Sequence, residues 1–275
     1  MQTEEIFSLT GVRFSYARPP APPAWALDGL DLTISRNEAL AVLGANGSGK
    51  STLLRLLDAL LYPVAGEILA FGQRLCEAAM AEEGFARRFR QQVGLVMQNS
   101  DAQLFNPTVL EEVAFGPLQL GLPDSEVLRR SETIFELLQI GHLRHRSPDC
   151  LSAGEKKRVA VACILATSPD VLLLDEPTAG LDPRSREALL DLLVDRRDAG
   201  QTIVLATQDL ELVRELAHRA VVLGEDHRLA ASGPANEIVG DRELLRAANL
   251  VGQERRPRYT ITAPASPPGN PCGRL

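Results

Sequence analysis

The segment that most constrains this chain is Gly44-Ala45-Asn46-Gly47-Ser48-Gly49-Lys50-Ser51. It lies between an apolar run at residues 38–43, which predicts a buried strand, and residues 50–61, which predict a helix. Its glycines allow the backbone to wrap closely around an anion, and the start of the helix adds free N–H donors. A chance glycine-rich turn is the alternative. Because a strand and a helix flank it, the segment predicts a phosphate-binding P-loop.

The side chains of this P-loop predict how a nucleotide is held. Lys50 can reach the β and γ phosphates, the Ser51 hydroxyl can ligate Mg²⁺, and Thr52 extends the pattern. Only three of the 29 basic residues are lysines, at positions 50, 156 and 157. Because the chain otherwise takes arginine, Lys50 indicates a site that needs a compact ammonium on a flexible stem.

Residues 171–174 predict a second apolar strand, which ends in two adjacent carboxylates, Asp175 and Glu176. Adjacent side chains project differently, so Asp175 can hold Mg²⁺ through water while Glu176 polarises an attacking water. A solvated strand end is the alternative. Beside a P-loop, the pair predicts the metal and hydrolysis side of a nucleotide site.

A second candidate phosphate-binding element is Leu151-Ser152-Ala153-Gly154-Glu155. Ser152 and Glu155 have the spacing of a capping box, which predicts the start of a helix. Ala153 and Gly154 are small enough to let a ligand approach the backbone, and a helix N-terminus favours an anion. Alone, the segment would be an ordinary helix cap. Together with the P-loop and the paired carboxylates, it predicts a second contact to a terminal phosphate.

Strand and helix patterns alternate along most of the chain. Strands are expected at residues 6–14, 30–34, 66–71, 92–96, 202–206, 221–223 and 228–232, and a helix near residues 184–197. Helical periodicity dominates from about residue 107 to 167, with helices at 109–115, 125–140 and 155–167. We therefore expect an α/β fold with a mainly parallel sheet and an inserted helical subdomain at about residues 99–167. Residues 19–23 form a proline-rich excursion, and 251–275 predict a disordered, proline-rich tail.

Composition excludes several classes of protein. The chain has no apolar run of about 18 or more residues, so no membrane-spanning helix is predicted, and its acidic start lacks a signal-peptide pattern. A net charge of −7 gives no electrostatic footprint for nucleic acid. The four cysteines are scattered without a CxxC pair, which favours reduced thiols over disulfides or a zinc site. These features predict a soluble, cytoplasmic protein.

The ordered set of motifs resembles the ATP-binding subunit of an ATP-binding cassette (ABC) transporter, over about residues 5–250. The resemblance implies a P-loop nucleoside triphosphatase core with an N-terminal antiparallel β region, ATP and Mg²⁺ as cofactors, and one nucleotide-binding domain at residues 1–250. It makes residues 151–155 the signature and 179–182 the D-loop. It makes Gln98 the Q-loop glutamine, a γ-phosphate sensor that joins Ser51 and Asp175 at the metal. Tyr16 stands where the family places an aromatic ring against adenine, with a core or turn tyrosine as the alternative.

The chain departs from the family pattern in two places. The signature is usually written with Gly and Gln where this chain has Ala153 and Glu155. After the strand at residues 202–206, the family places a switch histidine where Gln208 follows Thr207. Glutamine can donate a hydrogen bond to a γ-phosphate but cannot carry a proton. Hydrolysis is therefore expected to be slow, or to depend on a partner with an intact site.

Residues 93–105, 108–117 and 155–160 are similar to the energy-coupling ATPases of cobalt, nickel and vitamin importers. This resemblance implies a homodimer or heterodimer of ATPases that works with transmembrane coupling and substrate-binding subunits at the cytoplasmic face of the membrane. Leu104 and Phe105 are candidates for contact with such a partner, and core packing is their alternative. His142 and His145 are read as part of a solvated basic turn and not as metal ligands.

Three functions remain open from the sequence. The favoured one is the ATPase subunit of a cobalt or nickel importer, with a vitamin such as biotin as the alternative cargo. A soluble ABC protein of DNA repair or translation would be expected to show long coiled-coil insertions, tandem cassettes or basic faces, which this sequence lacks. A regulatory subunit with a weak active site is motivated by Gln208 alone.

Overall fold

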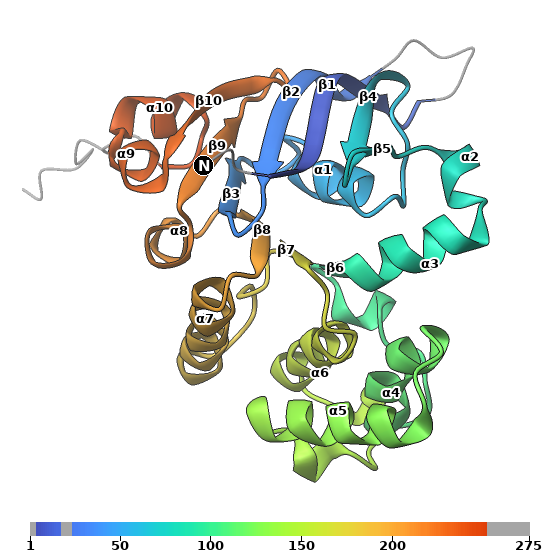
Figure 1. Cartoon of the computed structure of the whole chain (residues 1–275). Coiled ribbons are helices and arrows are strands. Elements are labelled where there is room, and N and C mark those ends of the chain that lie inside the picture. Colours follow the sequence, from blue (N-terminus) through green and yellow to red (C-terminus); the bar gives the residue numbers. More distant parts are fainter. Residues whose placement is uncertain (1–3, 18–23, 252–275) are drawn as a thin grey trace, which may run out of the picture.

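The computed structural model describes residues 4–17 and 24–251, and it contains two sheets (Figure 1). The smaller sheet is antiparallel, in the order β2-β1-β4-β5. Its strands are β1 (Glu5–Ser15), β2 (Trp25–Ser35), β4 (Ala65–Ala70) and β5 (Gln73–Arg74). This sheet is the predicted N-terminal antiparallel region. The proline-rich excursion at residues 19–23 and the predicted tail beyond residue 251 lie outside the described residues.

The larger sheet has the strand order β10-β9-β3-β8-β7-β6 and is parallel except at β10. Its strands are β3 (Ala39–Gly44), β6 (Val93–Val96), β7 (Val171–Asp175), β8 (Thr202–Thr207), β9 (Arg219–Leu223) and β10 (Leu229–Pro234). Strands β3, β7 and β8 are buried along their whole length, as expected for parallel strands covered on both faces. Their carboxyl ends meet at one edge, where α/β sheets hold ligands.

One face of the larger sheet packs against the smaller sheet and α1 (Lys50–Leu57). The sequence predicted that α1 would continue to residue 61. It ends earlier because Ala59 adopts a left-handed conformation with φ of 54°, which stops the helix. The helices that the sequence did not predict include α2 (Glu77–Met80) and α3 (Glu83–Gln92).

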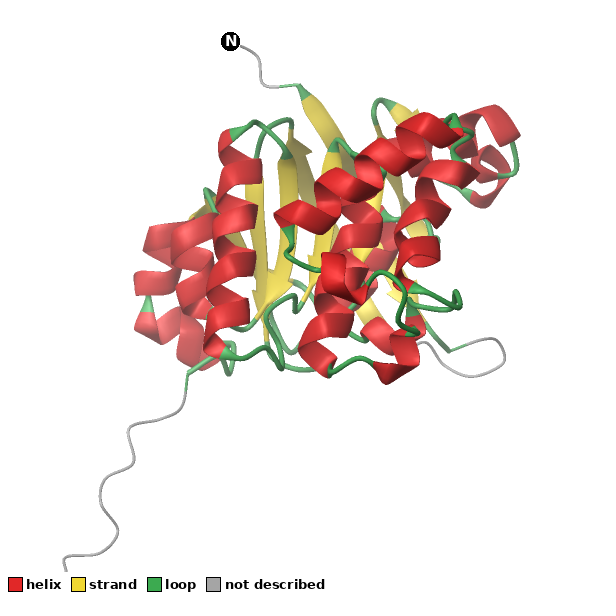
Figure 2. Cartoon of the chain, turned by 90° about the horizontal axis from the view of Figure 1, so that it is seen from below, coloured by secondary structure: helices red, strands yellow, loops and turns green. Residues whose placement is uncertain are grey.

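The other face carries most of the helices, which lie in front of the strands in Figure 2. They include α7 (Pro183–Asp198) and α8 (Leu210–Leu216), while α9 (Ala235–Gly240) and α10 (Arg242–Ala247) lie beside β9 and β10. Between β6 and β7 the chain forms α4 (Val109–Gln119), α5 (Asp124–Leu137) and α6 (Ala153–Ala166). These three helices share one apolar core with Leu172 and Leu174 of β7, so the helical region is anchored on the sheet.

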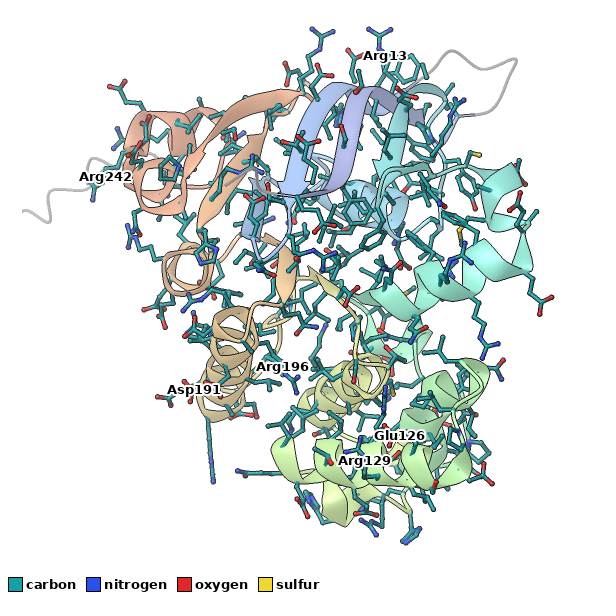
Figure 3. All side chains as sticks on the ribbon, viewed as in Figure 1. Arg13, Glu126, Arg129, Asp191, Arg196 and Arg242 are labelled. Carbon is teal, nitrogen blue, oxygen red and sulfur yellow. The ribbon has the colours of Figure 1, made fainter. Side chains whose placement is uncertain are left out.

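The surface of the helical region carries ion pairs beside exposed apolar side chains. On α5, Arg129 and Arg130 both pair with Glu126, and Figure 3 labels Glu126 and Arg129 on this helix. The two arginines lower the pKa of Glu126 to about 2.

The order and direction of the strands confirm the predicted α/β fold with a mainly parallel sheet. The domain limits of 1–250 and about 99–167 stay predictions.

Candidate functional site

A cavity of about 380 Å³ lies at the carboxyl end of β3 and is formed by segments far apart in the chain. It gathers the P-loop, the Q-loop residue, the second predicted carboxylate and the predicted adenine-stacking ring. Its lining residues are Tyr16, Trp25, Ala26, Asn46, Gly47, Gly49, Lys50, Ser51, Thr52, Gln98, Glu176 and His227. Ala45 and Ser48 line a smaller adjoining cavity. The structure therefore brings most of the predicted nucleotide-site residues together.

The P-loop takes its shape from glycines that no other residue could replace without movement. Gly49 has φ of 106°, and a Cβ there would lie 2.3 Å from the Ala26 carbonyl oxygen. A Cβ on Gly44 would lie 2.3 Å from Oγ of Ser48. Helix α1 then begins at Lys50, and Gly49 provides no side-chain cap for its first N–H groups. These donors face the position where a phosphate can bind.

Lys50 is only 6% exposed and lies inside this loop. Its Nζ donates to the carbonyl oxygens of Gly44, at 2.7 Å, and Ala45, at 3.1 Å. Burial lowers the pKa of the Lys50 ammonium, while the carboxylates of Glu176 and Asp175 act in the opposite direction. The arrangement places a positive charge between the loop that binds phosphate and the carboxylates at the end of β7.

Asp175 and Glu176 differ in environment. Asp175 is 7% exposed, and its Oδ1 is buried without a hydrogen-bond partner in the described part of the chain. A buried carboxylate oxygen without a partner, near Lys50 and the end of β3, fits a site for hydrated Mg²⁺. Glu176 has φ of 44°, its N–H donates to Ala206, and its Oε2 accepts from the Thr207 hydroxyl at 3.0 Å. This turn of the backbone separates the directions of the two carboxylates.

Burial raises the pKa of Glu176 above its usual value, in spite of the hydrogen bond from Thr207 and the charge of Lys50. A carboxylate with a raised pKa is a stronger base than an exposed glutamate once it is ionised. Because Glu176 lines the cavity, its carboxylate can accept a proton from a water held there. The chemistry expected of Glu176 from the sequence is compatible with this geometry.

Gln208 lies against the P-loop. Its Nε2 donates to Oδ1 of Asn46 at 2.6 Å, and both side chains are exposed. The next residue, Asp209, starts α8 by accepting from the N–H groups of Glu211 and Leu212. The chain thus delivers an amide donor beside the phosphate loop, at the position where a switch residue was expected.

Tyr16 is 55% exposed, so the alternative of a core tyrosine is wrong. Its hydroxyl lies 3.2 Å from Oγ1 of Thr52 and accepts from Arg55. Its ring meets Phe14 edge to face, with ring centroids 4.9 Å apart. An exposed ring fixed at the mouth of the cavity is suited to stacking on a base.

The segment 151–155 forms the predicted capping box at the start of α6, with both reciprocal hydrogen bonds present. Oε2 of Glu155 accepts from the Ser152 N–H at 2.8 Å, and this bonding lowers the pKa of Glu155. Ser152 and Ala153 are exposed and are not among the residues that line the cavity. Gly154 lies near the D-loop, since a Cβ there would be 3.7 Å from Leu181. The predicted second phosphate-binding segment therefore does not line the cavity at the P-loop of its own chain.

The residues near the site that were not predicted include Trp25, His227 and Lys157. Trp25 and His227 line the cavity, and Nδ1 of His227 is buried without a partner in the described structure. Lys157, which is 4% exposed, donates to the backbone beside Gln98. Trp25 and His227 have no local signal, because only the tertiary fold brings β2 and the β9–β10 turn to the P-loop. For Lys157, the rarity of lysine was a usable signal.

The remaining candidates divide between surface and core. Phe105 is 67% exposed and meets Phe115 edge to face at 5.0 Å, whereas Leu104 is partly buried against the core of the helical region. Core packing is therefore the correct reading for Leu104 and the wrong one for Phe105. Within residues 4–17 and 24–251, no group of three or more His, Cys, Asp or Glu side chains could hold a metal ion. No described helix is long and apolar enough to cross a membrane.

A P-loop at the carboxyl end of one parallel strand, with paired carboxylates at the same edge of the sheet, defines the class of P-loop nucleoside triphosphatases. The sequence also matches the family model described as ABC transporter over residues 27–179. The chain belongs to the ABC transporter family and is an ABC ATPase of the energy-coupling type, as the sequence predicted.

Three similar proteins place the chain within this family. The nickel import ATP-binding protein NikO of Rhodobacter capsulatus is 48% identical over 94% of this chain and 98% of its own length. The structure of cbiO1 from Clostridium perfringens, part of the ABC transporter complex cbiONQ, is 34% identical with a TM-score of 0.73, covering 90% and 95% of the two chains. A dimeric post-hydrolysis structure of the cassette MJ0796 with ADP and Pi is 25% identical with a TM-score of 0.75, covering 83% and 98%.

Proposed function

We propose that this chain is the ATP-hydrolysing subunit of an energy-coupling importer for nickel or cobalt ions. It drives transport through membrane-embedded partner subunits while it lies at the cytoplasmic face of the membrane. The observation that carries the choice of cargo is the 48% identity to NikO, which extends over almost the whole length of both proteins. A vitamin is the competing cargo, and transport assays distinguish the two.

In this proposal, the side chains of the cavity divide the work of hydrolysis. Lys50 and the uncapped N–H groups at the start of α1 bind the phosphates, and the exposed ring of Tyr16 stacks on adenine. Ser51, Asp175 and Gln98 would hold Mg²⁺, which neutralises charge on the β and γ oxygens when bound. Gln98 and Glu176 orient the attacking water, and Glu176 accepts its proton. Gln208 donates to the γ-phosphate from the position beside Asn46.

The signature supports a dimer in this proposal. Ser152 and Ala153 are exposed at a helix start that favours anions, yet residues 152–155 are not among those that line the cavity of their own chain. The similar cassette MJ0796 has been captured as a dimer. We infer that two copies of this chain face each other, so that each signature completes the ATP site that contains its partner's Lys50.

The exposed aromatic pair Phe105 and Phe115 supports contact with a membrane subunit. Both rings lie on the helical region, and Phe105 follows the Q-loop closely in the chain. Glu112, which is buried, accepts from the backbone N–H groups of Phe105 and Asn106 and holds this segment in place. A rigid apolar projection beside the Q-loop can pass a nucleotide-dependent movement to a partner.

Metal uptake by cells that express this chain with its membrane partners tests the proposal. Glu176→Gln is expected to abolish ATP-dependent accumulation of nickel or cobalt while the complex still assembles. Glu126→Gln is the matched control, since it makes the same change on α5, at a residue that does not line the cavity. Accumulation of biotin without any metal uptake would show that the cargo is a vitamin and not a metal ion. Recovery of ribosomes or DNA in place of membrane subunits would overturn the transporter role.

A further inference from the structure

The one buried lysine outside the P-loop lies on the signature helix. Lys157 is 4% exposed and belongs to α6, two residues after the capping-box residue Glu155. Its Nζ donates to the carbonyl oxygens of Met97, at 3.0 Å, and Gln98, at 2.9 Å. No function assigned so far to the nucleotide site uses this contact. Because burying an ammonium is costly, its retention in an arginine-rich chain calls for a physical reason.

The Q-loop backbone is held from a second side as well. The Met97 N–H donates to Oε1 of Gln103 at 3.0 Å, and Nε2 of that amide reaches the Leu95 carbonyl at 3.4 Å. Gln103 belongs to the same stretch of chain as the Q-loop, so it shapes the loop locally. Lys157 comes from a separate helix, so it fixes the loop relative to α6.

The geometry of this contact suits lysine better than arginine. Two neighbouring carbonyl oxygens converge on a single atom, Nζ, in a buried space. A compact ammonium can donate to both from one point, whereas a guanidinium presents its donors as a planar fork. Asp175 and Glu176 also lie close enough to interact with the charge of Lys157.

We propose that Lys157 is a positioning residue that holds Gln98 in place for hydrolysis and joins it mechanically to the signature. Gln98 lines the cavity of its own chain, and Ser152 begins the same helix that carries Lys157. A shift of the Q-loop when ATP is hydrolysed therefore moves α6 and the exposed signature with it. The effect on a second ATP site rests on the proposed dimer, whereas the positioning of Gln98 does not.

Lys156 offers a matched control on the same helix. Its Nζ pairs with Asp101 at 2.5 Å, and that carboxylate is 68% exposed. Exposed ion pairs contribute little, and this one does not contact the carbonyl groups of Met97 or Gln98. Lys156→Met removes the same charge from a side chain of the same length, and it leaves the two hydrogen bonds of Lys157 to the Q-loop in place.

The test compares Lys157→Met, Gln98→Ala and the double variant in the purified full-length protein, with Lys156→Met as the control. Lys157→Met is expected to lower kcat by roughly 10- to 100-fold, because a displacement of about 1 Å at a reacting centre has effects of that size. KM for ATP should stay within about three-fold of the wild type, since the P-loop is untouched. The double variant should be no slower than Gln98→Ala alone, because Lys157 acts through Gln98.

Two results would overturn the proposal. One is a kcat for Lys157→Met within about two-fold of the wild type, and the other is a double variant whose loss is the product of the two single losses. If Lys157→Met does not fold, as judged by thermal unfolding, Lys157→Gln enters the same cycle and is judged in the same way. A Hill coefficient of 1 for wild-type ATP hydrolysis would reject the dimer-dependent part while the cycle still decides the role of Lys157.

Discussion

The starts of α1 and α6 both offer backbone N–H groups to an anion, and they differ in every other respect. The start of α1 is part of a cavity, has no side-chain cap, and contains the buried ammonium of Lys50. The start of α6 is partly exposed, is capped by Ser152 and Glu155, and does not line the cavity at the P-loop. The first is built to hold a nucleotide within one chain. In the proposed dimer, the second would meet a phosphate that another chain presents.

Among the variants that test this comparison, removal of the Lys50 ammonium should have the largest effect on ATP turnover. Lys50→Met keeps the stem and loses the charge that the loop holds near Gly44 and Ala45. We expect ATP turnover to fall by about 10²- to 10³-fold, because preorganised donors at developing charge have effects of that size. ATP binding should weaken as well, measured by titration with a fluorescent analogue. Equal turnover by this variant and by Lys156→Met would contradict the account.

A charge introduced at the signature should have a different pattern. Gly154→Asp places a carboxylate at a helix start that tolerates it, yet it repels a phosphate. Since a Cβ at this position meets Leu181 only at 3.7 Å, Gly154→Ala serves as a control that fits the fold. We expect turnover to fall by roughly 10- to 100-fold while the single chain keeps its affinity for ATP. Loss of ATP binding by the isolated chain would place the signature in the site of its own chain.

Gln208 tests whether the site at the start of α1 contains every group that rapid hydrolysis needs. Its amide contacts Asn46 but cannot carry a proton. Gln208→His should therefore raise turnover by about ten-fold, in the range of a modest acid–base contribution. The measurement is steady-state phosphate release between pH 6 and 9. An unchanged rate would show that the amide is as effective as an imidazole at this position.

The smallest effect is expected at the far end of α1. Burial raises the pKa of Asp58 to about 7, against the opposing charge of Arg90. The folded state thus favours the protonated carboxyl, so this group's contribution to stability is lost as pH rises from about 4 through 7. Asp58→Asn mimics the neutral form. It should stabilise the protein by a few kcal/mol at pH 8 and by less than about 1 kcal/mol near pH 4.

Thermal unfolding at the two pH values measures this effect, and an equal gain in the free energy of unfolding at both would contradict it. Glu126→Gln is a suitable comparison, because Arg129 and Arg130 lower the pKa of that carboxyl.

Local patterns were sufficient to predict the parts of the site that depend on sequence neighbours. The P-loop, the carboxylates Asp175 and Glu176, and the Ser152 capping box each combine a strand or helix boundary with residues next to it. The early end of α1 was missed because a left-handed Ala59 has no distinct residue signature. The polar segment that forms α3 packs through the single buried residue Phe89, which gave little periodicity to detect.

Contacts between distant segments could not be predicted in this way. His227 reaches the P-loop only because β9 pairs with β3, and Trp25 only because β2 begins near the cavity. The contact of Lys157 with the Q-loop depends on how α6 packs beside β6. These contacts could not be predicted from the sequence, because they depend on how distant segments pack in the folded chain.

The most direct test mixes two impaired variants, Lys50→Met and Gly154→Asp, as purified full-length chains. If each site combines the P-loop of one chain with the signature of the other, a mixed dimer contains one intact site. Since about half of the dimers are mixed and each has one of two sites intact, recovery should approach roughly a quarter of the wild-type turnover, and less if the two sites are coupled. Full-length chains that exchange into mixed dimers, shown by tagged co-purification, and recover no activity would contradict the account.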